Sequence, residues 1–275
     1  MIDVPQRHRR VAHHDLAAPS NLTDRQLASM TMTFEGKRAL VTGASSGIGQ
    51  AVTTVLLERG AQVICVGRRR PSLQHIADRF PDTAIPVAAD LSSQTAIEAL
   101  VAVVRGMPDG LDILVNNAGH NDGGSTDFAS GSHADWKDVL TVNLSAMMQL
   151  THGLIPFLRM RPPGHVVNVG SIVSRMSAPN MTAYMASKHG VHGFCEALRA
   201  DYDDGSLRVT EILPGTVRTG FAERRWGGQN EADAFYERMP SYLTAADIAQ
   251  SIVWALSQPV SVTINEIVVT PTRRR

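Results

Sequence analysis

From Gly36 onward, short apolar runs rich in branched residues alternate with longer stretches of helical spacing. The short runs are apolar at successive positions, which is typical of strands buried on both faces of a parallel sheet. We expect strands at 38–42, 61–66, 84–89, 113–116, 165–170, 207–213 and 264–269, with helices at 47–59, 73–80, 93–104, 133–160, 182–202 and 244–256. Because crossovers between parallel strands are right-handed, this order predicts one doubly wound α/β domain with helices on both faces of the sheet.

The first 33 residues do not follow this alternation. They are rich in His, Arg, Asp and Ser and contain no apolar segment of the kind a secretory signal needs. We interpret 1–33 as a flexible N-terminal extension ahead of a domain at 34–275, with Met30 or Met32 as alternative starts. The Arg and His content is also typical of a transit peptide, although several aspartates in the segment argue against that alternative.

Charge and cysteine content exclude several classes of function. The 26 Lys and Arg residues balance the 26 Asp and Glu residues, so we expect no nucleic-acid or anionic-membrane surface. No run of about 18 apolar residues is present, so the sequence predicts no membrane span. Cys65 and Cys195 lie far apart in apolar stretches, without metal-ligand spacing, which favours reduced thiols in a cytoplasmic protein and no metal site.

A glycine-rich segment (TGASSGIG, 42–49) joins the first expected strand to the first expected helix. Gly43 permits a tight turn, and Gly47 and Gly49 allow backbone and helix to approach a ligand and the strand. The free N–H groups at the start of a helix attract phosphate. This strand-turn-helix context predicts a dinucleotide site at the carboxyl edge of the sheet.

The end of the second expected strand indicates which dinucleotide binds. An NAD site usually has a carboxylate here for the ribose 2′-hydroxyl, but this chain has Gly67 followed by Arg68, Arg69 and Arg70. Guanidinium groups bind a 2′-phosphate that a carboxylate would repel, and Ser45 can add a hydroxyl from the glycine turn. The sequence therefore favours NADP(H) over NAD(H).

Four further residues form a candidate proton-transfer site. Tyr184 and Lys188 are four positions apart on an expected helix, so they share a face, and an ammonium there is expected to lower the tyrosine pKa. Ser171 ends the fifth expected strand at the same sheet edge, where its hydroxyl can hold a substrate oxygen towards Tyr184. Asn143 is a polar residue among apolar neighbours, and a water leading to Lys188 would give it a partner.

These motifs, in this order and spacing, resemble the classical short-chain dehydrogenase/reductase family from about residue 34 to residue 270. Asn143, Ser171, Tyr184 and Lys188 match that family's catalytic tetrad. The residue pattern and the resemblance together predict cofactor contacts from Gly43, Ser45, Ser46, Gly47, Ile48, Gly49, Arg68, Arg69, Asp90, Leu91, Asn117, Ala118, Gly119, Tyr184, Lys188, Pro214, Gly215, Val217 and Thr219.

The resemblance also implies a Rossmann fold with a seven-stranded parallel sheet, and a homotetramer or homodimer associating through the two long helices at 133–160 and 182–202. It implies an NADP(H)-dependent oxidoreductase that interconverts a carbonyl and a secondary alcohol, with Tyr184 as general acid or base. The GRR sequence at 67–69 and the ending INEIVVTPT (264–272) are most similar to hydroxy-acid or serine dehydrogenases. The alternative is a catalytically silent NADP-binding protein with a regulatory or scaffolding role.

The sequence gives little information about the substrate. The segment 218–241 interrupts the strand-helix alternation, and we interpret it as an inserted lid over a small-molecule substrate. Aromatic residues in the lid suit a partly apolar ligand. Its arginines, Arg218, Arg224 and Arg225, either pair with a substrate carboxylate or are solvated, and the sequence favours solvation.

Overall fold

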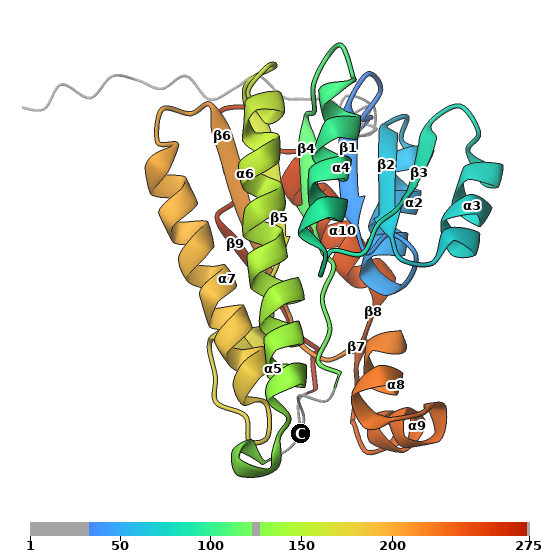
Figure 1. Ribbon diagram of the computed structural model, residues 1–275, viewed down its shortest axis with the longest axis vertical. Coiled ribbons are helices and arrows are strands. Elements are labelled where there is room, and N and C mark those ends of the chain that lie inside the picture. Colours follow the sequence, from blue (N-terminus) through green and yellow to red (C-terminus); the bar gives the residue numbers. More distant parts are fainter. Residues whose placement is uncertain (1–32, 123–126, 274–275) are drawn as a thin grey trace, which may run out of the picture. The chain divides into compact units, whose positions relative to one another are not determined.

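In the computed structural model, residues 33–122 and 127–273 are described. Seven parallel strands form one sheet in the order β3-β2-β1-β4-β5-β6-β9 (Figure 1). Their bounds are β1 (Arg38–Thr42), β2 (Gln62–Gly67), β3 (Ala84–Ala88), β4 (Ile113–Asn116), β5 (Gly164–Val169), β6 (Leu207–Pro214) and β9 (Glu266–Val269). The strand order reverses between β1 and β4, which is the arrangement of a Rossmann fold and confirms the predicted fold class. The predicted extension, apart from Thr33, lies outside the described residues.

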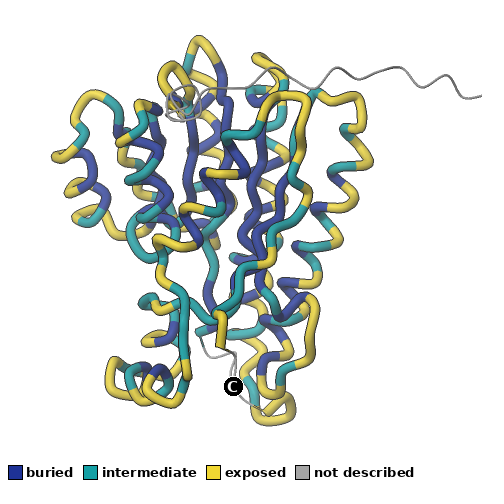
Figure 2. The backbone as a smooth tube through the Cα atoms, turned by 180° about the vertical axis from the view of Figure 1, so that it is seen from behind, coloured by how far each residue is buried: buried dark blue, intermediate teal, exposed yellow. Residues whose placement is uncertain are grey.

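Two layers of helices cover the sheet, and the burial of alternate strand residues determines which helix packs on which face. Side chains such as Val41 and Val63 pack under one layer, whereas their neighbours Leu40 and Ile64 pack under the other. The first layer consists of α2 (Gly47–Glu58), α3 (Arg70–Arg79) and α10 (Ala245–Leu256), and the second of α4 (Gln94–Arg105), α6 (Ala146–Leu158) and α7 (Thr182–Asp201). Figure 2 shows the buried strands between these more exposed helices. None of the helices in the described ranges has the length and apolarity to cross a membrane.

The prediction of one continuous helix over 133–160 is wrong, because a π-helical turn interrupts it. The chain forms α5 (His133–Leu140), a π-helical turn η2 (Thr141–Ser145) and then α6. A π-turn inserts one extra residue per turn and rotates the side chains that follow, and such turns frequently lie at functional sites. Here the turn contains Asn143.

The expected lid is a small substructure at the carboxyl end of the sheet (Figure 1). It contains α8 (Gly220–Trp226) and α9 (Gln229–Glu237), flanked by the short parallel strands β7 (Val217–Arg218) and β8 (Leu243–Thr244). Ala222, Ala232 and Tyr236 give it a separate apolar core. Two short 3-10 helices, η1 (Phe128–Ser130) and η3 (Ile172–Ser174), complete the described elements.

Candidate functional site

A cleft of about 760 Å³ lies at the carboxyl ends of the strands, between the sheet and the lid. It contains nearly every residue that the sequence singles out, although these residues come from segments far apart in the chain. Its lining includes Gly43, Ser45, Ser46, Gly47, Ile48, Arg68, Arg69, Asp90, Leu91, Asn117, Ala118, Gly119, Ser171, Tyr184, Lys188, Pro214, Gly215, Val217 and Thr219. Of the expected site residues, only Gly49 and Asn143 do not line it.

The glycine turn is tightly packed against the end of β4. Gly43 has φ +68°, and a Cβ atom there would lie 2.7 Å from Asn117 Nδ2. A Cβ atom on Gly49 would lie 2.3 Å from the Gly43 carbonyl oxygen and 2.4 Å from Asn117 Nδ2. Thr42 Oγ1 accepts from the backbone N–H groups of Asn117 and Ala118 at 2.9 and 3.0 Å. Gly49 thus lets α2 approach the turn from behind, which explains why it does not line the cleft.

The start of α2 faces the cleft with its backbone donors uncapped. Its N-cap residue Ser46 makes no side-chain capping bond, and the first turn contains no acidic residue. The first N–H groups of a helix have no partner within the helix, and the helix dipole places partial positive charge there. Gly47 and Ile48 in this turn line the cleft. This end of the cleft is therefore suited to a phosphate group.

Basic residues extend this anion-binding character beyond β2. Arg68 and Arg69 line the cleft, and Arg69 Nη2 donates to the Ser45 carbonyl oxygen at 3.0 Å, which joins the arginines to the glycine turn. On the adjacent strand end, hydrogen bonds from Ser92 lower the pKa of Asp90. Arg70 begins α3 and does not line the cleft.

Ser171, Tyr184 and Lys188 converge at the other end of the cleft. Tyr184 lies in the first turn of α7, and its side chain is hydrogen-bonded to that of Ser171, just beyond β5. Lys188 lies one turn later, with Nζ 5.7 Å from the centroid of the Tyr184 ring. Lys188 Nζ donates to the Val169 carbonyl oxygen at 2.8 Å. The structure thus brings these three residues together, as the sequence predicts.

Burial dominates the electrostatics of this group. It lowers the pKa of Lys188 to about 8, although the charge of Glu211 acts in the opposite direction. It raises the pKa of Tyr184, and the Ser171 hydrogen bond and the charge of Arg225 only partly offset that effect. The expected lowering of the tyrosine pKa is therefore wrong for the protein alone, because the expectation counted the lysine charge and omitted desolvation.

Asn143 lies behind the cleft and is fully buried among protein partners. Its Nδ2 donates to the His120 carbonyl oxygen at 2.8 Å and to Ser187 Oγ at 3.2 Å, and its Oδ1 accepts from the His120 N–H at 2.9 Å. The side chain therefore has protein partners where the sequence suggested a water. It joins the loop after β4 to α7, the helix that carries Tyr184 and Lys188.

Sequence reasoning missed His120 of the cleft wall, and it counted Tyr236 only as an apolar lid residue. His120 directly follows the Asn-Asn-Ala-Gly motif, a position that could have identified it, and its Nε2 lies 3.2 Å from Asp138 Oδ2. The hydroxyl of Tyr236 donates to the Val217 carbonyl oxygen at 2.9 Å and so attaches the lid to the strand beneath it. No pattern in the sequence indicates that this tyrosine, unlike the other lid aromatics, has a polar partner there.

The sequence and the fold of the chain are similar to those of known dehydrogenases. The family model described as short chain dehydrogenase matches residues 37–230. A serine 3-dehydrogenase of Agrobacterium fabrum is 34% identical over 233 residues, which cover 84% of this chain and 92% of that protein. An uncharacterized oxidoreductase of Staphylococcus aureus is 31% identical over 236 residues, covering 86% of this chain and 97% of that protein.

The chain is also similar to solved structures of dehydrogenases. The closed form of a serine dehydrogenase complexed with NADP+ superposes with a TM-score of 0.79 at 31% identity, covering 84% of this chain and 94% of that one. The matches to these proteins extend over most of the chain. They include the glycine turn and the segments that carry Ser171, Tyr184 and Lys188. The chain belongs to the short-chain dehydrogenase family of oxidoreductases.

Proposed function

We propose that this protein is an NADP(H)-dependent oxidoreductase that interconverts a carbonyl and a secondary alcohol, with Tyr184 as the general acid or base. One observation carries the proposal: Ser171, Tyr184 and Lys188 converge in the same cleft as the glycine turn and the uncapped start of α2. A hydroxyl positioned next to a phosphate-binding turn can protonate an oxygen as the carbonyl carbon is reduced.

The cleft residues fit a dinucleotide with a 2′-phosphate. When bound, NADPH supplies the hydride. A Cβ atom at Gly43 or Gly49 would clash with Asn117 or with the turn itself, so glycine at these positions lets α2 begin close beneath the turn. The first N–H groups of α2 are then at the cleft, where they can contact the pyrophosphate. Arg68 and Arg69 are suited to the 2′-phosphate. The similar serine dehydrogenase structure is a complex with NADP+, which supports the same assignment here.

The chain's own residues then have separate roles in the proton transfer. Ser171 donates a hydrogen bond to the substrate oxygen, and Tyr184 gives that oxygen its proton. Lys188 supplies positive charge near the phenol and stays charged only below its pKa of about 8. Asn143 holds the loop after β4 against α7 and so supports the helix that carries Tyr184 and Lys188.

We expect loss of the two cleft arginines to weaken NADP(H) binding selectively. Replacing both Arg68 and Arg69 with Gln should raise the Kd for NADPH by about 10–100-fold, because charge-assisted hydrogen bonds to the 2′-phosphate are lost. The Kd for NADH, which has no 2′-phosphate, should change by less than about threefold. Fluorescence titration measures both constants. Arg70→Gln, next to the pair but outside the cleft, is the matched control; equal losses for the two cofactors would contradict the assignment.

For the substrate, we propose a hydroxy acid or the corresponding keto acid. Arg218 pairs with Asp233 at 3.0 Å, and Arg224 lies 3.5 Å from Asp122, so both have acidic partners in or near the lid. Arg225 is partly buried in the cleft wall, where its guanidinium lies 4.5 Å from the centroid of the Trp226 ring and its charge affects the pKa of Tyr184. The name of the Agrobacterium relative, serine 3-dehydrogenase, supports the same substrate class.

Arg225→Gln should therefore raise KM for carboxylate-bearing substrates by about 10–100-fold, since an anion would lose a charge-assisted partner. Neutral substrates of similar size should change by less than about threefold. Steady-state kinetics on matched acid and amide substrates measure this difference. Arg224→Gln serves as the control, and equal effects on acid and amide substrates would refute a carboxylate contact.

A cofactor-turnover panel tests the proposed function. We expect purified protein to oxidise NADPH, or reduce NADP+, with at least one member of a set of ketones, aldehydes, 3-hydroxy acids and secondary alcohols. Turnover with NADH should be slower. Tight NADPH binding without turnover on any member would instead favour the catalytically silent role.

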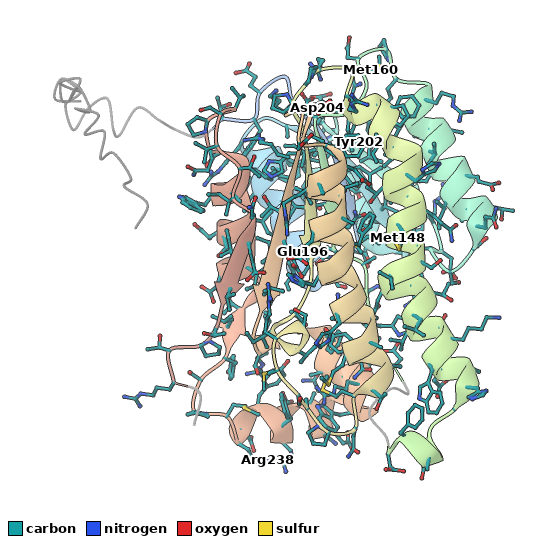
Figure 3. The ribbon with its side chains drawn as sticks, turned by 90° about the vertical axis from the view of Figure 1, so that its left-hand side faces the viewer. Met148, Met160, Glu196, Tyr202, Asp204 and Arg238 are labelled. Carbon is teal, nitrogen blue, oxygen red and sulfur yellow. The ribbon has the colours of Figure 1, made fainter. Side chains whose placement is uncertain are left out.

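We also propose a cytoplasmic homotetramer or homodimer that binds NADP(H) and a small-molecule substrate. Cys65 and Cys195 are free and buried, which suits a reducing compartment. An apolar groove on α5, η2 and α6 supports self-association. Its lining includes Trp136, Leu140 and Met148, which is labelled on α6 in Figure 3.

A further inference from the structure

A row of polar residues crosses the buried sheet beneath α6 and α7. Asn116, Asn168, Glu211 and Glu266 are register partners on β4, β5, β6 and β9. Asn116 Nδ2 donates to Asn168 Oδ1 at 2.9 Å, and Asn168 Nδ2 donates to Cys195 Sγ at 3.1 Å. Polar side chains inside a sheet core need such partners, and the asparagines have them. Glu211 differs from the asparagines, because one of its two carboxylate oxygens has no hydrogen-bond partner.

The carboxyl group of Glu211 is completely buried, with a side-chain exposure of 0%. Its Oε2 lies 2.7 Å from His192 Nδ1 on α7. Its Oε1 has no hydrogen-bond partner and packs against Gly170, where an added Cβ would lie 2.5 Å away. Burial raises the pKa of Glu211, and the His192 contact and the charge of Arg175 only partly offset that effect. A buried carboxylate with one unpaired oxygen is costly unless a positive charge lies nearby.

Lys188 is positioned to supply that charge. It precedes His192 by one turn of α7, so both side chains lie on the same face of the helix. Its Nζ donates to the carbonyl of Val169, the residue before Gly170. Glu211 and Lys188 therefore contact adjacent residues at the end of β5, and the negative charge of Glu211 raises the pKa of Lys188 against the effect of burial.

The other charged groups around Glu211 pair with one another. Arg175 Nη2 pairs with Glu266 and lies 3.4 Å from His192 Nδ1. Glu196, labelled on α7 in Figure 3, lies 3.6 Å from His192 Nε2. Cys195 also faces Glu211 from α7. His192, Glu211 and Glu266 could by their spacing hold a metal ion, but the Arg175 guanidinium already supplies a cation to this cluster.

We propose that Glu211 is a positioning residue of the site, whose buried carboxylate keeps the Lys188 ammonium charged from behind strand β5, with His192 holding Glu211 in its ionised form. Only the expected effect of Glu211 on turnover rests on the proposed function. Glu211 touches neither the cleft nor the reacting atoms, and it acts through Lys188. Near neutral pH, Lys188 is close to its titration midpoint. Loss of the Glu211 charge therefore leaves Lys188 uncharged in much of the protein population.

The lysine content of the chain allows a direct test that needs no substrate. The sequence has three lysines, Lys37, Lys137 and Lys188. In full-length protein labelled with 13C at lysine Cε, NMR titration gives one curve for each of them. The Lys188 signal is assigned by its loss in Lys188→Arg. In Glu211→Gln we expect the Lys188 midpoint to fall by about one pH unit. In Glu266→Gln, which removes a carboxylate from the same cluster, it should move by less than about 0.3 unit.

An unchanged Lys188 midpoint in Glu211→Gln, or an equal shift in Glu266→Gln, would overturn the proposal. If Glu211→Gln does not fold, as judged by circular dichroism, His192→Gln replaces it. That variant removes the group that keeps Glu211 ionised, so it should shift Lys188 in the same direction, and no shift there would count against the proposal equally.

Turnover gives the second readout. The alkaline limb of the pH profile for carbonyl reduction should move to lower pH in Glu211→Gln, and Glu211→Asp should restore at least half of that shift. An unmoved limb in an active enzyme would contradict the role of Glu211. Absence of turnover in the wild type would instead overturn the proposed function, while the NMR result would still decide whether Glu211 sets the charge of Lys188.

Discussion

Replacing Tyr184 with phenylalanine is expected to lower kcat by about 10²–10⁴-fold, because the substrate oxygen then loses its positioned proton donor. The substitution removes one hydroxyl and leaves the ring in its contacts with the lid, where the Tyr184 and Phe221 rings lie 5.6 Å apart. The Kd for NADPH should therefore change by less than about threefold. Stopped-flow measurement of NADPH consumption and a separate fluorescence titration of binding distinguish the two effects.

Tyr236→Phe is the matched control for this experiment. Tyr236 also lines the cleft, but its hydroxyl donates to the Val217 carbonyl oxygen and has no part in the proposed proton transfer. Its removal should reduce kcat by less than about tenfold. If Tyr184→Phe retains more than about a tenth of the wild-type rate, another group must protonate the substrate oxygen.

The second large effect is expected from Gly49→Ala in the glycine turn. The new methyl group would lie 2.3 Å from the Gly43 carbonyl oxygen, so either α2 or the turn must move. Because the N–H groups of α2 define the proposed phosphate site, the Kd for NADPH should rise by about 100-fold or more. The free energy of unfolding should fall by about 1–3 kcal/mol, the usual cost of overpacking. Calorimetric titration and urea unfolding measure these two quantities.

Gly193→Ala tests whether these losses come from the close contact. Gly193 lies inside α7, and no atom lies within 4 Å of the position its Cβ would occupy. Alanine at that position should leave NADPH binding unchanged and stabilise the helix by up to about 1 kcal/mol. Normal NADPH affinity in Gly49→Ala would show that the turn tolerates a shift and would refute the proposed phosphate site.

The sheet and the cleft could be predicted because they depend on local patterns repeated along the chain. Runs such as 38–42 are too short for a helix and largely apolar at successive positions, which favours buried strands, and parallel strands bring their carboxyl ends to one edge. Ser171, Tyr184 and Lys188 could therefore be brought together from positions in the sequence alone. The sequence pattern does not give distances between side chains, so it could not predict their hydrogen-bond partners or their pKa shifts.

The π-helical turn at Asn143 shows why the remainder could not be predicted. Helical periodicity continues through 133–160 in the sequence, and the extra residue per turn is determined by tertiary contacts with His120 and Ser187. Likewise, the direction of the Tyr184 pKa shift depends on its burial, which no spacing reveals. Glu211 looked like an ordinary strand residue until the register of β5, β6 and β9 placed it beside His192.

Transfer of deuterium from labelled cofactor tests the central claim most directly. NADPH carrying deuterium at its transferable position is incubated with wild-type protein and a carbonyl acid, and the alcohol product is analysed by mass spectrometry and NMR. The proposed function predicts deuterium on the former carbonyl carbon with the wild type, and at least about 100-fold less labelled product in equal time with Tyr184→Phe. Tight binding of NADPH without any labelled product in the wild type, over the full range of carbonyl substrates, would contradict it.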